Sequence, residues 1–229
     1  LLRFFGFLFT AGTIMFLAGL AAVAGLFWHF SKDLPDYSQL QDYEPPVMTR
    51  VHAADGSLLG EFAKERRLYL PIQAVPKLVI NAFLAAEDKN FYEHGGIDYT
   101  GMARAGVSYV QNFGSNRRPQ GASTITMQVA KMFFQEGQQR DYEAKFAQML
   151  LARKIEQEMT KDEIFELYLN KSFFGHRSYG IAAAAEFYYG KELDQLSLGE
   201  IATLVGANLD GLDKAPKGAL QAVRNFLAA

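Results

Sequence analysis

The chain has 229 residues, and its 23 basic and 25 acidic side chains leave a net charge of −2. This balance lacks the positive field by which proteins attract nucleic acid, so we expect no nucleic-acid partner. The absence of cysteine excludes disulfides and thiolate chemistry. The length is sufficient for one or two domains with a buried core, and the four histidines never recur at the spacing of a zinc-binding helix.

One apolar run dominates the start of the chain. Residues 4–30 contain no Asp, Glu, Lys or Arg. A helix needs about 20 such residues to cross the hydrocarbon core, whereas a cleaved signal peptide has a shorter apolar region. Arg3 precedes the run and predicts a cytoplasmic N-terminus. We therefore predict a single-pass transmembrane signal anchor over residues 1–31, with the following residues outside the cytoplasm.

Residues 32–75 are predicted to form a linker and a β-hairpin. The first part is polar and interrupted by prolines, as linkers are. Asp55-Gly56 then lies between apolar residues, and Asp-Gly is a strong turn signal between two short strands. Pro76 suits the first turn of a helix. We place the start of the main domain there, over residues 76–229.

An acid, an aromatic ring and an imidazole follow at helical spacing. Glu87, Phe91 and His94 occupy positions i, i+4 and i+7, which share one face of an α-helix, and Gly95-Gly96 predicts the end of that helix. A carboxylate beside aromatic and apolar groups has a raised pKa and suits a general base. An amphipathic helix with an exposed acidic pair, Glu87 and Asp88, explains the spacing equally well.

Residues 99–113 are mostly apolar, with few charges. They predict either an ordinary amphipathic helix or a hydrophobic flap that dips into the outer leaflet of the membrane. The predicted membrane anchor favours the flap.

A second polar face follows from residue 120. Ser123 suits the capping position of a helix. Thr124, Gln128 and Lys131 then recur at i, i+4 and i+7 and present a hydroxyl, an amide and an ammonium near a positive helix N-terminus. These groups suit a phosphate or a sugar, although a polar face is also the rule for a surface helix.

Together these stretches resemble the glycosyltransferase family 51 domain of peptidoglycan synthases, which occurs in class A penicillin-binding proteins and monofunctional transglycosylases. Glu-Asp-x-x-Phe-x-x-His-x-Gly-x-Asp at 87–98 is similar to the first family motif, and Gln-Gly-Ala-Ser-Thr-Ile-Thr-x-Gln at 120–128 to the second. Residues 161–170 resemble the fourth motif and 196–204 the fifth. The resemblance keeps motif order and spacing over about residues 35–208.

The third motif departs from the family pattern Arg-Lys-x-x-Glu. Lys145 is kept, but Ala144 replaces the arginine and Gln148 replaces one of the two catalytic carboxylates of the family. Glutamine keeps the size of glutamate and an acceptor oxygen, but it loses the charge and the acid–base capacity. Alanine removes a guanidinium that pairs with pyrophosphate. Residues 207–218 also depart from the fifth motif.

The resemblance implies that lipid II is polymerised into glycan strands, with inversion at the donor sugar and release of undecaprenyl pyrophosphate. Glu87 is then the base, Gln148 occupies the position of the second carboxylate, and Asp88 holds the motif through backbone hydrogen bonds. The pyrophosphate calls for cations or for a divalent ion such as Mg²⁺ or Mn²⁺, for which no ligand set is evident. The residues expected to bind substrate are Phe91, His94, Ser123, Thr124, Gln128, Lys131, Arg140 and Lys145.

The expected fold is mainly α, a two-lobed lysozyme-like domain with a cleft and a small β-hairpin, preceded by one transmembrane helix. Strand signals are scarce outside the hairpin. Capping boxes at Thr160-x-x-Glu163 and Ser197-x-x-Glu200 predict two helix starts. Residues 142–158 and 181–189 are also predicted to be helices.

Three functional hypotheses stay open. The first is a membrane-anchored peptidoglycan glycosyltransferase impaired at its third motif by Ala144 and Gln148. The second is a catalytically inactive lipid II-binding or scaffolding protein of the cell-wall machinery, and the third is a muramidase that cleaves glycan. The expected partners are lipid II, the growing glycan chain, membrane lipids and other cell-wall synthesis proteins, at the periplasmic side of a bacterial inner membrane. No transpeptidase domain follows in the sequence, so we expect a monofunctional enzyme or a fragment of a longer one.

Overall fold

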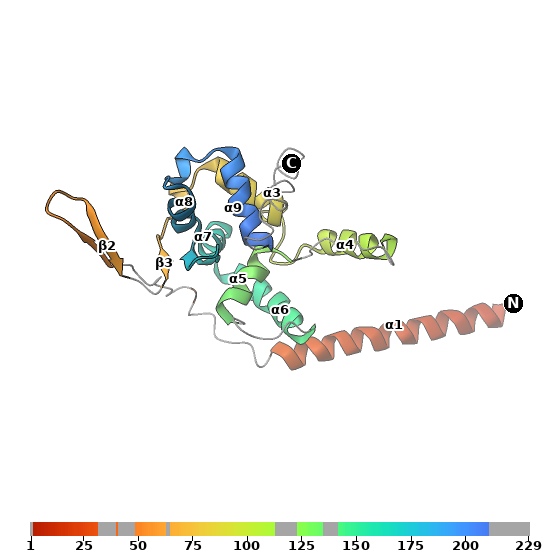
Figure 1. The fold of residues 1–229 in the computed structure, drawn as a ribbon. Coiled ribbons are helices and arrows are strands. Elements are labelled where there is room, and N and C mark those ends of the chain that lie inside the picture. The colour runs from red at the N-terminus through yellow and green to blue at the C-terminus, as the bar shows by residue number, and fades with distance from the viewer. Residues whose placement is uncertain are drawn as a thin grey trace.

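A computed structural model describes residues 2–31, 40, 49–62, 65–112, 123–134 and 142–210, and it is mainly helical (Figure 1). The α-helices are α1 (Leu2–Ser31), α3 (Lys77–Glu87), α4 (Tyr99–Gln111), α5 (Ile125–Phe134), α6 (Tyr142–Glu158), α7 (Lys161–Lys171), α8 (Ile181–Tyr189) and α9 (Leu198–Asp210). The strands are β1 (Thr49–His52), β2 (Leu58–Phe62), β3 (Arg66–Arg67) and β4 (Ser178–Tyr179), and the short 3-10 helices are η1 (Ile72–Ala74) and η2 (Leu193–Gln195).

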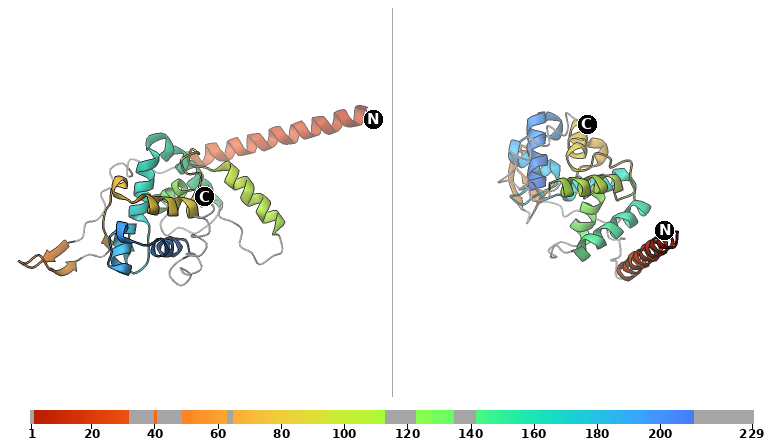
Figure 2. Two further views of the ribbon diagram at one scale, coloured as in Figure 1. Left: turned by 90° about the horizontal axis from the view of Figure 1, so that it is seen from above. Right: turned by 90° about the vertical axis from the view of Figure 1, so that its right-hand side faces the viewer.

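The core is built around α5 and α7. Helix α5 packs against α6 and α7, and α3 packs against α9 (Figures 1 and 2). Ile125 of α5 and Phe165 and Tyr168 of α7 are fully buried. The Phe165 and Tyr168 rings are stacked, with their centroids 6.1 Å apart. The mainly helical class predicted from the sequence is confirmed.

Helix α1 extends away from the other helices and contacts them at α6 (Figure 1). Its 30 residues cover the predicted anchor. Within the described residues, no helix combines the length and the apolarity needed to cross a membrane. The transmembrane assignment is therefore not confirmed and stays a prediction.

The β-hairpin predicted around Asp55-Gly56 is confirmed. Strands β1 and β2 pair antiparallel, with Thr49 opposite Phe62. Gly56 has φ +85°, a conformation that glycine adopts without steric cost. The hairpin projects from the helical body on the side opposite α1 (Figure 1). The second sheet is a short parallel pair of β3 and β4.

Four predicted helices agree with the structure at the boundaries that the sequence predicted. Helices α6 and α8 have the predicted bounds. Thr160 and Glu163 form a reciprocal capping box at the start of α7. At the start of α9, Glu200 Oε2 accepts from the backbone N–H and the hydroxyl of Ser197, while Glu200 N donates to Ser197 Oγ.

The predicted helix through Glu87, Phe91 and His94 is wrong. Helix α3 ends at Glu87, Asp88 leaves it with φ −158° and ψ 80°, and the following residues form turns. The physical reason is that the Asp88 side chain accepts hydrogen bonds from the His94 ring and from the Ile125 backbone, which a continued helix would prevent. Gly96 does not end a helix either. It lies against α6 with φ +88°, where an added Cβ would be 2.7 Å from the Ala152 carbonyl oxygen.

Residues 99–111 form the amphipathic helix α4, which buries none of its side chains. It projects from the helical body in Figures 1 and 2. Val110 is 73% exposed, and Tyr99, Val107 and Tyr109 are also exposed. The helix is therefore confirmed, whereas its insertion into a membrane stays a prediction.

Candidate active site

Glu87 lies at the C-terminal end of α3, where three other helices supply neutral hydrogen-bond donors. Gln128 Nε2 of α5 donates to Glu87 Oε2 at 2.8 Å, and Asn208 Nδ2 of α9 donates to Glu87 Oε1 at 3.2 Å. The Tyr168 hydroxyl of α7 also hydrogen-bonds to Glu87. The packing of α3 against α9 and of α5 against α7 brings these donors together.

Burial raises the pKa of Glu87 above its ordinary value of 4.5. The hydrogen bonds from Gln128, Tyr168 and Asn208 oppose this rise, and the negative charge of Asp88 adds to it. A desolvated carboxylate with neutral hydrogen-bond donors, as the described residues provide here, is a stronger base than an exposed glutamate. The raised pKa predicted for Glu87 is thus found, although the aromatic neighbour is Tyr168 and not Phe91, and its role as the base stays a prediction.

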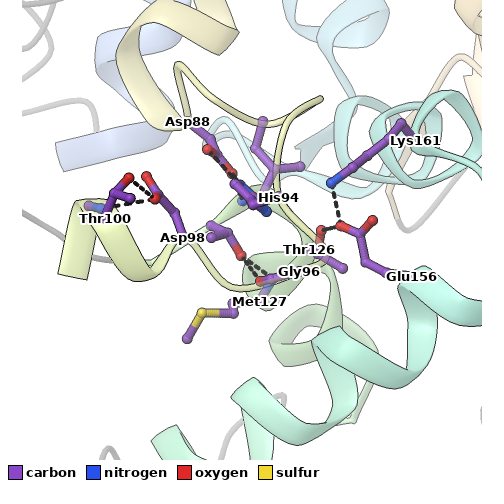
Figure 3. A network of polar contacts seen from close by, with 12 residues as sticks. Asp88, His94, Gly96, Asp98, Thr100, Thr126, Met127, Glu156 and Lys161 are labelled. Carbon is purple, nitrogen blue, oxygen red and sulfur yellow. Dashed lines mark hydrogen bonds and ion pairs between the residues drawn. The ribbon is translucent and has the colours of Figure 1, made fainter. Parts of the chain in front are cut away.

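Asp88 holds the segment after α3 in place. Both of its carboxylate oxygens lie 3.0 Å from His94 Nε2, and Oδ2 also accepts from the Ile125 backbone N–H at 3.0 Å (Figure 3). Since these oxygens act as acceptors, His94 Nε2 carries the hydrogen. Within the described residues, His94 Nδ1 is buried without a hydrogen-bond partner. The predicted structural role of Asp88 is confirmed.

Thr124 caps α5 and is buried. Its hydroxyl donates to the Gly96 carbonyl at 2.7 Å and accepts from the Met127 backbone N–H at 3.2 Å (Figure 3). The prediction that Ser123 caps this helix is thus corrected. Thr124 is only 2% exposed, so it does not belong to the polar face predicted for α5. That face consists of Gln128 and Lys131, which are one turn apart.

Ser123, Lys145 and Gln148 form a second polar group. Lys145 Nζ donates to Ser123 Oγ at 2.6 Å and to Gln148 Oε1 at 3.4 Å. Burial lowers the pKa of Lys145, and the charge of Lys131 lowers it further. Two ammonium groups that repel each other at a half-buried site attract an anion. Arg140, the third predicted cation, lies outside the described residues.

Phe91 is part of the core beneath this site. It is fully buried, 5.8 Å from the Phe165 ring, and Lys161 Nζ lies 4.3 Å from its centroid. Lys161 also pairs with Glu156 at 2.7 Å, and Glu156 accepts from the Thr126 hydroxyl (Figure 3). This partly buried network connects the turn after α3 to α5, α6 and α7. In this structure Phe91 therefore supports the turn and is not exposed to a ligand.

The sequence profile of the family described as Transglycosylase matches residues 55–223. The chain belongs to the Transglycosylase family. Penicillin-binding protein 1A of Rickettsia typhi is 45% identical over 203 residues, which are 89% of this chain and 25% of that protein. Penicillin-binding protein 1A of Escherichia coli is 42% identical over 200 residues, 87% of this chain and 22% of that protein.

The transglycosylase chain thus spans about a quarter of the length of the curated relatives it matches. A crystal structure of Penicillin-Binding Protein 1A from Haemophilus influenzae covers 81% of this chain and 19% of that chain, with 25% identity and a TM-score of 0.42, a likeness too low to establish a shared fold. The resemblance to glycosyltransferase family 51 is confirmed by the profile match, and with it the enzyme class, peptidoglycan glycosyltransferase.

Two residues of this transglycosylase site were missed in the sequence. Tyr168 lies among the apolar positions of α7, where an aromatic residue indicates only a core position. Asn208 lies in the stretch that departs from the family pattern, so no motif pointed to it. Its amide nitrogen is 2.5 Å from the Tyr168 hydroxyl as well as within reach of Glu87. Residue spacing along one helix could not predict either contact of Asn208, because Tyr168 is 40 residues away in the chain and Glu87 is 121 residues away.

Proposed function

We propose that this transglycosylase polymerises lipid II into glycan strands, with inversion at the donor sugar and release of undecaprenyl pyrophosphate. The observation that carries the proposal is the juxtaposition along α5 of a desolvated carboxylate and a pair of cations. Gln128 contacts Glu87, and Lys131, one turn further, lies close enough to Lys145 to lower its pKa. Adjacent turns of α5 thus lie beside the base, Glu87 of α3, and beside the second cation, Lys145 of α6.

In the proposed reaction Glu87 accepts the proton of the acceptor 4-hydroxyl. The new bond forms between that oxygen and the donor sugar carbon, while the bond from this carbon to the pyrophosphate oxygen breaks and its electron pair leaves with the pyrophosphate. Each oxygen of Glu87 accepts a hydrogen bond from Gln128 or Asn208. A carboxylate has about four lone-pair sites, so the donors Gln128, Asn208 and Tyr168 leave one of them for the incoming proton.

The leaving pyrophosphate is proposed to meet Lys131 and Lys145. Ammonium groups stabilise the charge that develops on the departing oxygens, and a desolvated setting strengthens this interaction. Ser123 orients Lys145 through its hydroxyl at 2.6 Å. We retain His94 and Thr124 as motif residues that support the site through Asp88 and Gly96 rather than by contact with the substrate.

The described residues around Lys145 do not fit a protein-held divalent ion. Ser123 and Gln148 offer a hydroxyl and an amide, whereas Mg²⁺ sites in proteins use carboxylates together with substrate phosphates. Across the part of the chain that the structure describes, no group of three His, Cys, Asp or Glu side chains could hold a metal ion. A role for Mg²⁺ or Mn²⁺ at the pyrophosphate stays a proposal, and the steps above do not depend on it.

A non-catalytic lipid II-binding or scaffolding role is the second candidate, and Gln148 is the observation that favours it. At this position the family carries a carboxylate, and glutamine cannot take part in proton transfer or balance the charge of Lys145. A lipid II polymerisation assay on the wild-type chain and on Gln148→Glu separates the two. We expect glycan chains from the Gln148→Glu variant. If neither protein makes chains while both bind lipid II, the enzyme proposal fails, and release of fragments from preformed peptidoglycan would support a muramidase.

We also propose that residues 1–31 anchor a lysozyme-like two-lobed domain at the periplasmic face of the bacterial inner membrane. Support comes from the uncharged run at 4–30 and from the exposed apolar side chains of α4. A tether in the leaflet of a lipid-linked substrate raises the effective concentration of both. After alkaline extraction of bacterial membranes, the full chain is expected in the pellet, and its release into the supernatant would contradict the anchor. We also propose other cell-wall synthesis proteins as partners, because they would act at the same membrane face.

A further inference from the structure

We infer that Asn208 is a positioning residue for Glu87, which it holds both directly and through the Tyr168 hydroxyl. The inference rests on the proposed role of Glu87 as the base. It assigns a function to a residue of the 207–218 stretch, where the sequence departs from the fifth motif of the family.

The geometry is a closed triangle of three side chains. Asn208 Nδ2 lies 3.2 Å from Glu87 Oε1 and 2.5 Å from the Tyr168 hydroxyl oxygen. An amide nitrogen carries two hydrogens, so it can donate to both partners at once. The tyrosine hydroxyl, which accepts from Asn208, keeps its own hydrogen for Glu87. One asparagine therefore orients two groups that both act on the base.

The tyrosine of this triangle is restrained by its packing. Tyr168 is fully buried, stacked on Phe165 and in edge contact with the Phe83 ring, whose centroid is 6.2 Å away. Asn208 is fixed in turn by α9, which packs against α3. A side chain held in this way keeps the carboxylate of Glu87 in one orientation, as proton transfer from a bound hydroxyl requires.

The donors also hold the carboxylate without neutralising it. Gln128 from α5, Tyr168 from α7 and Asn208 from α9 are uncharged, and the charged group acting on Glu87 from its own chain segment is Asp88. An arginine or lysine in the place of Asn208 would form an ion pair and depress basicity strongly. An amide instead lowers the proton affinity by an intermediate amount. Asn208 is therefore suited to set the pH at which the base becomes active.

The test uses the full chain in detergent micelles with ¹³C-labelled glutamate carboxyl groups. The Glu87 signal is assigned by its loss in Glu87→Gln, and its titration is compared in wild type and Asn208→Leu. Leucine has a similar volume and no donor, so we expect the titration midpoint of Glu87 to rise by about one pH unit. If Asn208→Leu does not fold, the Glu87 titration is measured on Asn208→Ala instead. Asn81→Leu, at an exposed position of α3, is the control and is expected to leave the midpoint unchanged.

The same variants are assayed for lipid II polymerisation across pH in the Gln148→Glu background. We expect Asn208→Leu to shift the acidic limb of the rate profile by the same amount and to lower kcat about tenfold while KM stays within twofold. A Glu87 midpoint that moves by less than 0.2 unit in Asn208→Leu and Asn208→Ala overturns the inference. A shifted midpoint in a protein that never polymerises lipid II leaves the role of Asn208 in place and removes the proposed function, so the two failures are distinguishable.

Discussion

The two ends of the site differ in how their charged groups are held. The base end, formed by Glu87, Gln128, Tyr168 and Asn208, gives the carboxylate a donor from each of three helices. The cation end, formed by Ser123, Lys131, Lys145 and Gln148, holds two ammonium groups beside an amide, at a position where the resemblance to the family predicts a carboxylate.

Under the proposed function, this difference predicts which step of the reaction is impaired. A base needs orientation and desolvation, and the base end supplies both without the third motif. Leaving-group departure needs balanced charge and proton control, and Gln148 supplies neither. The structure therefore predicts a chain that is prepared to activate the acceptor and limited at the donor.

The largest effect is expected from restoring the third motif. Gln148→Glu returns a carboxylate to Lys145 and is expected to raise the polymerisation rate about 100-fold, because acid–base groups contribute roughly 10²–10⁴-fold. Adding Ala144→Arg is expected to give about a further tenfold through contact with pyrophosphate. The measurement is the initial rate of glycan formation from lipid II. Gln157→Glu, an exposed change on the same helix, is the control and should leave the rate unaltered.

The base end depends on the turn that Gly96 allows. Gly96→Ala forces an unfavourable φ and brings a Cβ within 2.7 Å of the Ala152 carbonyl, so we expect a loss of about 2–3 kcal/mol in the free energy of unfolding. Urea denaturation measures it. The neighbouring Gly95 has open space around its Cβ position, and Gly95→Ala is expected to change stability by less than about 0.5 kcal/mol. Equal effects at the two positions would contradict the assigned geometry.

The cation end is tested by its affinity for inorganic pyrophosphate. Lys145→Met removes one of two neighbouring ammonium groups and is expected to weaken binding about tenfold, or about 1.4 kcal/mol. Isothermal titration calorimetry provides the dissociation constant. Arg153→Met removes the same charge from an exposed position of α6 and should change it by less than twofold. A similar loss of pyrophosphate affinity in both variants would contradict a specific site and would indicate only a general attraction by the positive charge of the protein.

The smallest effect concerns stability at the base end. The folded-state pKa of Glu87 is raised by burial, so below pH 4 both the folded and the unfolded chain carry the protonated group and no difference arises. As pH rises through the unfolded value toward the folded one, the unfolded chain releases its proton first and the wild type loses stability. The Glu87→Gln variant does not lose stability in this way, because glutamine does not titrate. We expect its Tm, relative to wild type, to be higher at pH 8 than at pH 4, and a lower relative Tm at pH 8 would contradict the burial of the charge.

Local pattern predicted the elements well and their contacts poorly. The bounds of α6 and α8, the capping boxes and the hairpin follow from periodicity and turn residues that act within a few positions. The end of α3 did not follow, because Asp88 leaves the helix to reach Ile125, 37 residues away. Helical spacing cannot anticipate a hydrogen bond of that range.

The sequence predicted the motif residues of the site but not the residues that position them. Glu87, Gln128 and Lys145 were named from motifs, and the structure brings each of them to one of the two ends. Phe91 and Thr124 proved to be buried, since motif membership does not distinguish a group that binds from one that packs. Asn208 required the packing of α9 against α3, which no local pattern encodes.

The central claim is that Glu87 is the base of this site, and single-turnover polymerisation of lipid II tests it most directly. The comparison is between Gln148→Glu and the double variant Glu87→Gln/Gln148→Glu, with lipid II binding measured on both. The predicted result is a loss of at least about 10³-fold in the double variant with binding unchanged. A double variant that polymerises lipid II within tenfold of the Gln148→Glu rate would contradict the claim.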